Sequence, residues 1–184
     1  RFPIVARRPH TTDSFLLNGR RFRVSRGFAE LDLQVTPQFQ LTLLAAHLKS
    51  KRPVPEADQA ELREQESLLL REKIDARLKT NPSAPLIVLG DFNDTRVAKP
   101  VRTLIGRRRT ALVDLRPEEA TRTAPDAPLH RTAANITWTY FYNREDSYSR
   151  FDYVLVNRAL ASRVVPEQTC VLALPWWREA SDHR

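Results

Sequence analysis

The sequence predicts an α/β fold of the α+β type, in which strands form sheets and helices cover their faces. Residues 86–89 are four consecutive aliphatic residues between Pro85 and Gly90, which is typical of a short buried strand. Residues 56–79 are rich in Glu, Gln, Leu, Arg and Lys, all strong helix formers. A long helix among short apolar strands indicates a mixed fold. Further runs of strand length follow at residues 137–142, 151–156 and 170–174.

The N-terminal part of the chain predicts a β-hairpin. Residues 22–35 contain stretches in which apolar and charged side chains alternate, and residues 39–48 form a second segment of strand character. Residues 36–38, with the sequence Thr-Pro-Gln, lie between them. They predict the connecting turn, because proline favours a turn geometry.

The helix predicted at residues 56–79 has one broad apolar face, as expected of a helix that covers a sheet. Asn81 and Pro82 predict its end, because the residue before a proline is disfavoured in the helical conformation. The apolar face consists of Leu62, Leu69, Leu70, Ile74 and Leu78.

The remaining segments complete the expected order of elements. Residues 97–105 predict a short helix and residues 111–115 a short strand. Residues 118–135 contain two alanine-proline steps and predict mostly irregular structure. Neither a linker nor an internal repeat divides the chain, so a single domain covering residues 1–184 is expected.

Composition and charge restrict the classes to which the protein can belong. Hydrophobic residues make up 41% of the 184 residues and charged residues 28%, as in a globular protein. No apolar stretch approaches the length of a membrane span. Cys170 is the only cysteine, which excludes a disulfide within the chain. The formal net charge of +8 favours a polyanionic partner such as nucleic acid, and a monomer is expected.

Polar side chains capable of catalysis stand at the ends of the apolar runs. Asp91 and Asn93 follow the first buried strand, and Asp152 begins a later one. Asp182 and His183 stand together at the end of the chain. Because the ends of strands present side chains from a rigid scaffold, we expect these residues to converge in one site.

Taken in order, these motifs resemble the endonuclease/exonuclease/phosphatase superfamily, which has the deoxyribonuclease I-like fold. The carboxylate-bearing segments are Gly-Asp-Phe-Asn at residues 90–93, Ser-Arg-Phe-Asp-Tyr at residues 149–153 and Ser-Asp-His at residues 181–183. A His-Leu element at His47 and a Trp-Thr-Tyr element at residues 138–140 match as well. The resemblance extends over nearly the whole chain, and it implies a two-sheet β-sandwich flanked by helices.

The resemblance also implies that the domain is partial. Family members open with strands that carry an asparagine and a metal-binding glutamate, and these strands precede the region that resembles residues 1–4. The chain contains no methionine, begins with Arg1 and extends one residue beyond His183. A fragment that lacks the N-terminal third and the last strand is therefore expected, with impaired activity.

Catalytic roles for four residues follow from the resemblance. His183 would act as the general base, a role suited to the ordinary pKa of histidine. Asp152 would orient its imidazole ring, and Asp91 would position the nucleophile or assist the leaving group. Asp182 matches a metal-ligand position, and a carboxylate site suits Mg²⁺ or Mn²⁺.

Three further residues would contact the substrate. Asn93 would donate its amide to a phosphoryl oxygen or hold the attacking water, and His47 would donate a hydrogen bond to a phosphate oxygen. Trp138 would form part of the pocket wall. The implied activity is metal-dependent hydrolysis of a phosphodiester substrate by an endonuclease or exonuclease, with nucleic acid favoured by the positive charge.

Structural roles remain open for the same residues. Asp91 can cap the following turn while Asn93 completes an Asx turn, Asp152 can pair with Arg150, and His47 can be a structural histidine. Two other functions are also open. One is a phosphatase or phospholipase-type phosphodiesterase acting on small or lipid substrates, and the other is a truncated module that binds phosphate polymers without cleaving them.

Overall fold

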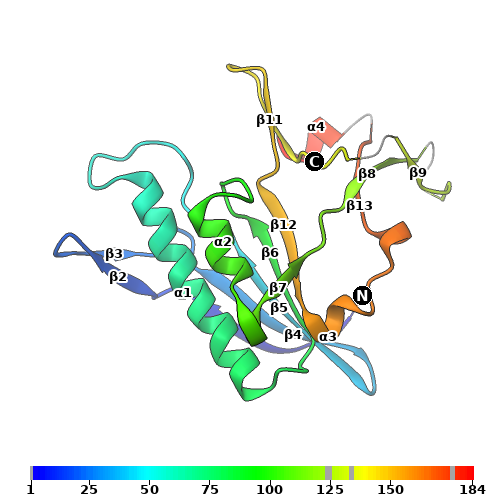
Figure 1. The fold of residues 1–184 in the computed structure, drawn as a ribbon, viewed down its shortest axis with the longest axis horizontal. Helices are drawn as coiled ribbons and strands as arrows, with labels where there is room; N and C mark the ends of the chain where they lie inside the picture. The colour runs from blue at the N-terminus through cyan, green and yellow to red at the C-terminus, as the bar shows by residue number, and fades with distance from the viewer. Residues whose placement is uncertain (1, 123–125, 133–134, 175–176) are drawn as a thin grey trace.

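The computed structural model describes residues 2–122, 126–132, 135–174 and 177–184 (Figure 1). Its centre is a six-stranded mixed sheet with the strand order β1-β4-β5-β6-β12-β7. Neighbouring strands are antiparallel except β5 and β6, which run parallel. The strands are β1 Ile4–His10, β4 Phe28–Thr36, β5 Phe39–Ala46, β6 Leu86–Asp91, β12 Asp152–Asn157 and β7 Leu112–Asp114.

Helix α1 (Gln59–Thr80) connects the parallel strands β5 and β6, since parallel neighbours need a long crossover. The carboxylate of Asp58 caps the helix by accepting hydrogen bonds from two N–H groups of its first turn, and the helix ends at Asn81 as predicted. Helix α2 (Lys99–Ile105) lies beside α1 on the same face of the sheet (Figure 1). Their shared core includes Leu70, Ile74, Leu78, Val101 and Leu104 from the helices and Leu44, Leu86, Val88 and Leu155 from the sheet.

Three smaller sheets surround the main one. Strands β2 and β3 form a hairpin that extends to the left in Figure 1, β10 and β11 form a second hairpin, and β13, β8 and β9 form a three-stranded sheet. These strands are β2 Ser14–Leu17, β3 Arg20–Arg23, β8 Glu118–Thr121, β9 His130–Arg131, β10 Tyr140–Tyr142, β11 Ser147–Ser149 and β13 Cys170–Leu172. The short helices are α3 Arg158–Ala161 and α4 Trp177–Ala180, with 3₁₀ turns at Arg108–Thr110 and Pro166–Gln168.

The predicted fold class, an α/β fold of the α+β type whose sheets are flanked by helices, is confirmed, and the described strands form one six-stranded sheet with three smaller sheets. The two predicted helices and the turn at residues 36–38 are present with small shifts of their ends. Residues 118–135, predicted to be mostly irregular, contain two short strands that the sequence did not predict, β8 and β9. Among the described residues, no helix combines the length and hydrophobicity that crossing a bilayer requires.

The predicted strand at residues 22–35 is interrupted. Strand β3 ends at Arg23 and β4 begins only at Phe28. Gly27 lies in the interruption with φ +70°, and a Cβ atom there would meet the carbonyl oxygen of His10 at 2.8 Å. The backbone therefore approaches β1 too closely at this point for a side chain.

A polar network connects β1, β4 and α1. Glu30 accepts a hydrogen bond of 2.9 Å from Arg8 Nε and another from Arg77 of α1, and its Oε2 lies 2.8 Å from His10 Nε2. Burial alone would raise the pKa of Glu30, but the hydrogen bonds from these three partners outweigh burial and lower the pKa from 4.5 to about 2. The network holds the C-terminal half of α1 on the sheet.

Gly90 brings the ends of β5 and β6 together. Its φ is +134°, and a Cβ atom there would lie 2.0 Å from the carbonyl oxygen of Ala46. Beyond this contact, the Leu48 N–H donates a hydrogen bond of 3.0 Å to the carbonyl of Asp91. The glycine thus permits a close approach of two strand ends that carry candidate site residues.

Candidate active site

The site lies where β6 ends and β12 begins. Asp91 is the last residue of β6 and Asp152 is the first of β12, and the two residues are paired across the antiparallel ladder. Residues directly opposite each other in such a ladder point to the same face of the sheet. The two carboxylates therefore lie side by side at one edge of the main sheet.

The C-terminal segment brings His183 to these carboxylates. This segment forms an antiparallel bridge between His183 and Tyr140, and the Arg184 N–H donates a hydrogen bond of 2.8 Å to the carbonyl of Thr139. The imidazole Nδ1 of His183 lies 2.6 Å from Asp152 Oδ2, and the ring packs against Tyr140 with 4.8 Å between centroids. The hydrogen bond with Asp152 raises the pKa of His183 and outweighs the opposing effect of burial.

Thr139 fixes the backbone position of Asp152. Its buried hydroxyl oxygen accepts hydrogen bonds of 3.1 Å from the backbone N–H groups of Phe151 and Asp152. The start of β12 is therefore attached to the same segment that holds the C-terminal histidine. This arrangement reduces the freedom of both members of the His183–Asp152 pair.

Both ring nitrogens of His183 face a carboxylate. Nε2 lies 3.9 Å from Asp91 Oδ2, so a water molecule at this position can contact both groups. Burial raises the pKa of Asp91, the charge of Asp152 raises it further, and the opposing contribution of the Asn93 N–H does not cancel these effects. A perturbed carboxylate beside an oriented histidine is typical of a site for proton transfer.

Asn93 holds Asp91 in place. Its backbone has φ +52°, and its N–H donates a hydrogen bond of 2.7 Å to Asp91 Oδ1, which is the Asx turn that the sequence left open. Its side-chain Nδ2 donates to the carbonyl of Leu48 at 3.0 Å and to Asp91 Oδ2 at 3.1 Å. In this geometry both amide hydrogens are engaged by protein oxygens.

His47 lies on the open side of Asp91. It follows directly after β5, and its Nε2 is 3.2 Å from Asp91 Oδ2. About half of its side chain is exposed, so the ring can reach a ligand that enters from solvent. The structure therefore brings Asp91, Asn93, Asp152, His183 and His47 into one cluster.

A sequence model of the endonuclease/exonuclease/phosphatase family matches residues 1–183. The chain belongs to this family. The match includes all five motifs from which the resemblance was inferred, so the predicted relationship is confirmed. None of the curated proteins compared with the chain is significantly similar to it in sequence.

Solved structures of the endonuclease/exonuclease/phosphatase family share the fold at low sequence identity. The human Nocturnin catalytic domain with bound sulfate has a TM-score of 0.56 at 14% identity, over 86% of this chain and 49% of that one. The mannosyl-6-phosphatase of Bacteroides thetaiotaomicron VPI-5482 has a TM-score of 0.54 at 15% identity, over 86% and 54%. Sphingomyelinase C from Streptomyces griseocarneus has a TM-score of 0.52 at 16% identity, over 86% and 50%. The chain spans about half the length of these structures.

The pairing of Asp152 with Arg150, which the sequence left open, does not occur. Arg150 instead forms a bidentate ion pair with Asp114, at 2.8 and 2.6 Å, and its guanidinium lies 4.3 Å from the ring centroid of Tyr153. Burial opposes the charge of Arg150, but the Asp114 carboxylate raises its pKa above the usual value. Asp152 is consequently left to His183.

Asp182 does not join the cluster closely. Its side chain is exposed, and its charge contributes to raising the pKa of His183 without a hydrogen bond to the imidazole. In residues 2–122, 126–132, 135–174 and 177–184, no three Asp, Glu, His or Cys side chains are arranged to hold a metal ion. Asp182 can supply one carboxylate ligand, but the described residues by themselves do not form a complete metal site.

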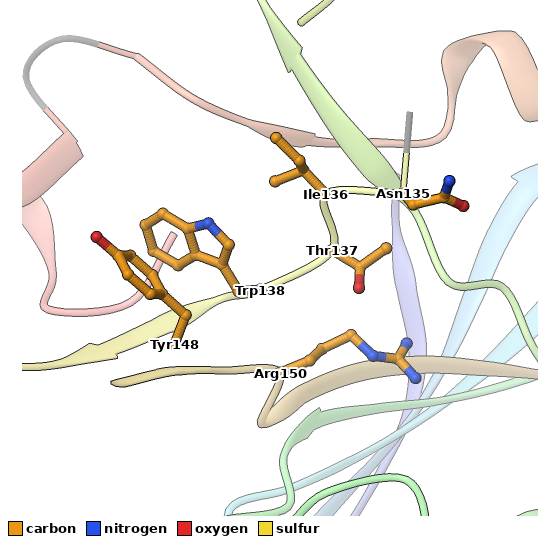
Figure 2. A pocket seen from close by; sticks show the side chains of 6 residues that line it. All are labelled: Asn135, Ile136, Thr137, Trp138, Tyr148 and Arg150. Atoms are coloured by element: carbon orange, nitrogen blue, oxygen red, sulfur yellow. The ribbon is translucent and has the colours of Figure 1, made fainter. Parts of the chain in front are cut away.

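Trp138 lies in a separate pocket of about 410 Å³ that Figure 2 shows. The Arg184 guanidinium lies 3.2 Å from the centroid of its indole, and Tyr148 packs at 4.8 Å. One face of the indole is thus covered by the protein itself. The pocket is lined by Asn135, Ile136, Thr137, Trp138, Tyr148 and Arg150.

The sequence analysis missed Lys51. Its Nζ lies 3.7 Å from Asp94 Oδ1 and 4.8 Å from the ring centroid of Phe151, the residue before Asp152. The structure therefore places a cation at the rim of the site. Two further cations beside Lys51 in the sequence, in the segment after the His-Leu element, are the signal from which it could have been found.

Proposed function

We propose that this chain carries the catalytic histidine and its carboxylate partners of a divalent-metal-dependent phosphodiester hydrolase of the nuclease type. Members of the family are phosphoric ester hydrolases. The observation that carries the proposal is the His183–Asp152 pair at 2.6 Å, whose free ring nitrogen faces Asp91. An oriented imidazole beside a buried carboxylate is the arrangement that general-base activation of water requires.

In this proposal, His183 removes a proton from water through Nε2. Asp152 accepts the Nδ1–H hydrogen bond, which fixes the tautomer and stabilises the imidazolium that forms. Because its pKa is raised, His183 is an active base only at higher pH than an ordinary histidine. The rate should therefore rise with pH through the pKa of His183.

The other members of the cluster position the water and the phosphate. Asp91 is close enough to both histidines to orient a water molecule at Nε2 of His183 or to assist the leaving oxygen. His47 is exposed and donates a hydrogen bond to a phosphoryl oxygen. Asn93 holds Asp91, and its amide binds a phosphoryl oxygen only if the substrate displaces one of its present acceptors.

A divalent ion, Mg²⁺ or Mn²⁺, would supply charge neutralisation at the phosphoryl group. Enzymes of the family generally depend on such ions. We assign Asp182 to the ion as one ligand. The other ligands would come from outside the cluster, because the described residues contain no group of three that could hold a metal ion. Trp138 is proposed as a wall for the substrate beyond the scissile phosphate, where its pocket opens to solvent.

Two alternatives compete with the nuclease. A phosphatase or a lipid phosphodiesterase is favoured by the fold shared with a mannosyl-6-phosphatase and with sphingomyelinase C. A module that binds phosphate polymers without cleaving them is favoured by the incomplete metal site. Positive charge close to the site supports a nucleic-acid ligand over a small or lipid ester, and the His183–Asp152 pair supports cleavage over binding alone.

Hydrolysis of matched chromogenic esters separates these functions. Bis(p-nitrophenyl) phosphate, p-nitrophenyl phosphate and p-nitrophenylphosphorylcholine are incubated with the product of the whole reading frame, beside the 184 residues, and with Mg²⁺ or Mn²⁺, with and without EDTA. The proposal predicts turnover of the diester that EDTA abolishes. Preferred turnover of the monoester or of the choline ester would identify the phosphatase or the lipid enzyme, and the absence of turnover of any ester would favour the binding module.

A further inference from the structure

Two basic segments lie next to each other beside the start of α1. Residues 14–26 contain four arginines and no acidic residue, and residues 47–55 contain three cations and no acidic residue. The first segment is the β2–β3 hairpin with the residues that follow it, and it projects from the body of the protein (Figure 1). We name their seven cations the basic track: Arg20, Arg21, Arg23, Arg26, Lys49, Lys51 and Arg52.

The two segments line a common pocket of about 290 Å³. Arg20, Arg21 and Arg23 contribute from the hairpin, Lys49 contributes from the second segment, and Glu56 and Glu66 also line the pocket. All cations of the track except Lys49 are exposed. In the part of the chain that the structure describes, none of the five arginines of the track forms an ion pair with a carboxylate. Their charge is therefore available to a ligand.

The base of the hairpin is attached to the body of the protein. Phe15 is buried and stacks on Phe22 across the two strands, with 6.0 Å between ring centroids. Buried Glu66 of α1 accepts hydrogen bonds from the N–H and hydroxyl of Ser25 and from the N–H of Lys49. This single side chain therefore fixes both basic segments relative to each other. Preorganised cations bind a polyanion at a lower entropic cost.

The basic track begins at the candidate active site. The carbonyl of Leu48 accepts hydrogen bonds from Asn93 Nδ2 at 3.0 Å and from Arg26 at 3.2 Å, so one oxygen connects the site to the track. Lys51 lies over Phe151, which precedes the carboxylate that orients His183. A polymer bound at the site would meet these cations first and the hairpin arginines farther out.

We propose that the basic track is an accessory surface that binds the phosphates of a nucleic-acid strand whose scissile phosphate lies at His183. The inference rests on the proposed function and specifies its substrate as a polymer. A small ester would not extend from the site to the hairpin, whereas a strand offers successive phosphates to guanidinium groups, which bind phosphate through paired hydrogen bonds. A membrane surface would require apolar side chains beside the cations. Leu16 is the one large exposed hydrophobic residue among the described residues of the two segments.

The test measures binding of a fluorescein-labelled single-stranded oligonucleotide by fluorescence anisotropy, in EDTA so that cleavage does not interfere. The variant Arg20→Gln/Arg23→Gln removes two exposed charges of the hairpin. Its matched control, Arg107→Gln/Arg109→Gln, removes two exposed charges next to β7, near the end of β12 farthest from Asp152. Circular dichroism and thermal unfolding of each variant establish that the overall fold is intact.

Each phosphate contact contributes about 0.7 to the slope of log K against log salt for a single strand. The hairpin variant should therefore lose about 1.4 from the slope, which corresponds to roughly 25-fold weaker binding near 0.1 M salt. The control pair should bind like the wild type, and Arg20→Lys/Arg23→Lys should retain the slope. The proposal would be overturned if the hairpin variant and the control variant lost oligonucleotide affinity equally, or if the hairpin variant lost none.

Two further measurements separate the possible failures. Cosedimentation with vesicles of phosphatidylcholine and phosphatidylserine tests the other polyanionic surface, and vesicle binding that depends on Arg20 and Arg23 without oligonucleotide binding would replace nucleic acid with a membrane. Turnover of bis(p-nitrophenyl) phosphate tests the proposed function independently. Normal turnover with unchanged oligonucleotide binding in the hairpin variant would refute only the track, whereas track-dependent binding without turnover would refute only the hydrolase.

Discussion

Substitution of Glu66 by Gln should destabilise the loop that carries His47 and weaken the whole fold. Glu66 is 1% exposed and accepts three hydrogen bonds, at 2.8 and 2.6 Å from Ser25 and at 2.6 Å from the Lys49 N–H. All three partners are donors. A glutamine of the same shape offers one oxygen and one NH₂ group, so one buried donor faces another donor in the variant.

The expected loss follows from this mismatch. A hydrogen bond to a charged group contributes about 1.5–3 kcal/mol, and leaving a buried donor unsatisfied costs about 1–3 kcal/mol. Glutamine has the shape of glutamate, so the variant loses mainly one hydrogen bond to the buried side chain and leaves its donor unsatisfied. Glu66→Gln should therefore lower the free energy of unfolding by about 2–3 kcal/mol. This is a substantial fraction of the roughly 5–15 kcal/mol that stabilises a typical domain.

Urea denaturation followed by circular dichroism measures the loss. The matched control is Glu64→Gln on the same helix, where the carboxylate pairs with the exposed Lys99 at 2.5 Å. Surface ion pairs contribute about 0–1 kcal/mol, so the control should remain near the wild type. A Glu66→Gln variant within about 0.5 kcal/mol of the wild type, the usual range for surface substitutions, would refute the role assigned to Glu66.

Three other outcomes are expected. Gly90→Ala should lower the free energy of unfolding by at least about 2–3 kcal/mol, because its Cβ has no space. Gly19 has φ +76° but open surroundings, so Gly19→Ala should lower the free energy of unfolding by only about 1–2 kcal/mol, measured by thermal unfolding. Equal losses of stability in Gly90→Ala and Gly19→Ala would contradict the steric role of Gly90. The depressed pKa of Glu30 should stabilise the fold above about pH 4.5, by about 3 kcal/mol, and this contribution should disappear as the pH falls towards 2. Measured by urea denaturation across that range, the free energy of unfolding of Glu30→Gln should depend on pH less than that of the wild type. The same pH dependence in both proteins would exclude a stabilising role for the Glu30 network. The hydrogen bond with Asp152 raises the pKa of His183, so in Asp152→Asn the NMR titration of His183 should move to lower pH than in the wild type, and an unchanged titration would refute the hydrogen bond.

Much of the geometry of the candidate site could be predicted because its residues stand at strand ends. The apolar run before Asp91 and the run after Asp152 identify two strands from local sequence alone, and Asp91 and Asp152 prove to be direct neighbours. The helix with Leu70, Ile74 and Leu78 was equally accessible, since its apolar period follows from helical geometry. These features depend on residues close together in the chain.

Features that depend on distant partners could not be predicted. Arg150 pairs with Asp114, 36 residues away, and nothing in the segment around Arg150 distinguishes this partner from Asp152. The amide of Asn93 is engaged by Leu48, 45 residues away. At Gly27, before Phe28, a Cβ atom would lie 2.8 Å from the carbonyl oxygen of His10, a contact with a distant strand. In each case, tertiary packing decides the outcome.

The most direct test of the central claim compares His183→Ala with His130→Ala in hydrolysis of bis(p-nitrophenyl) phosphate with Mg²⁺ or Mn²⁺. His130 is exposed on β9 and outside the cluster, so it controls for the loss of a histidine. Because the chain spans about half the length of the structures it matches, the product of the whole reading frame is assayed beside the 184 residues. We predict metal-dependent turnover that falls about 10²–10⁴-fold in His183→Ala and is unchanged in His130→Ala. Turnover that persists in His183→Ala, or no turnover by either wild-type protein, would contradict the account.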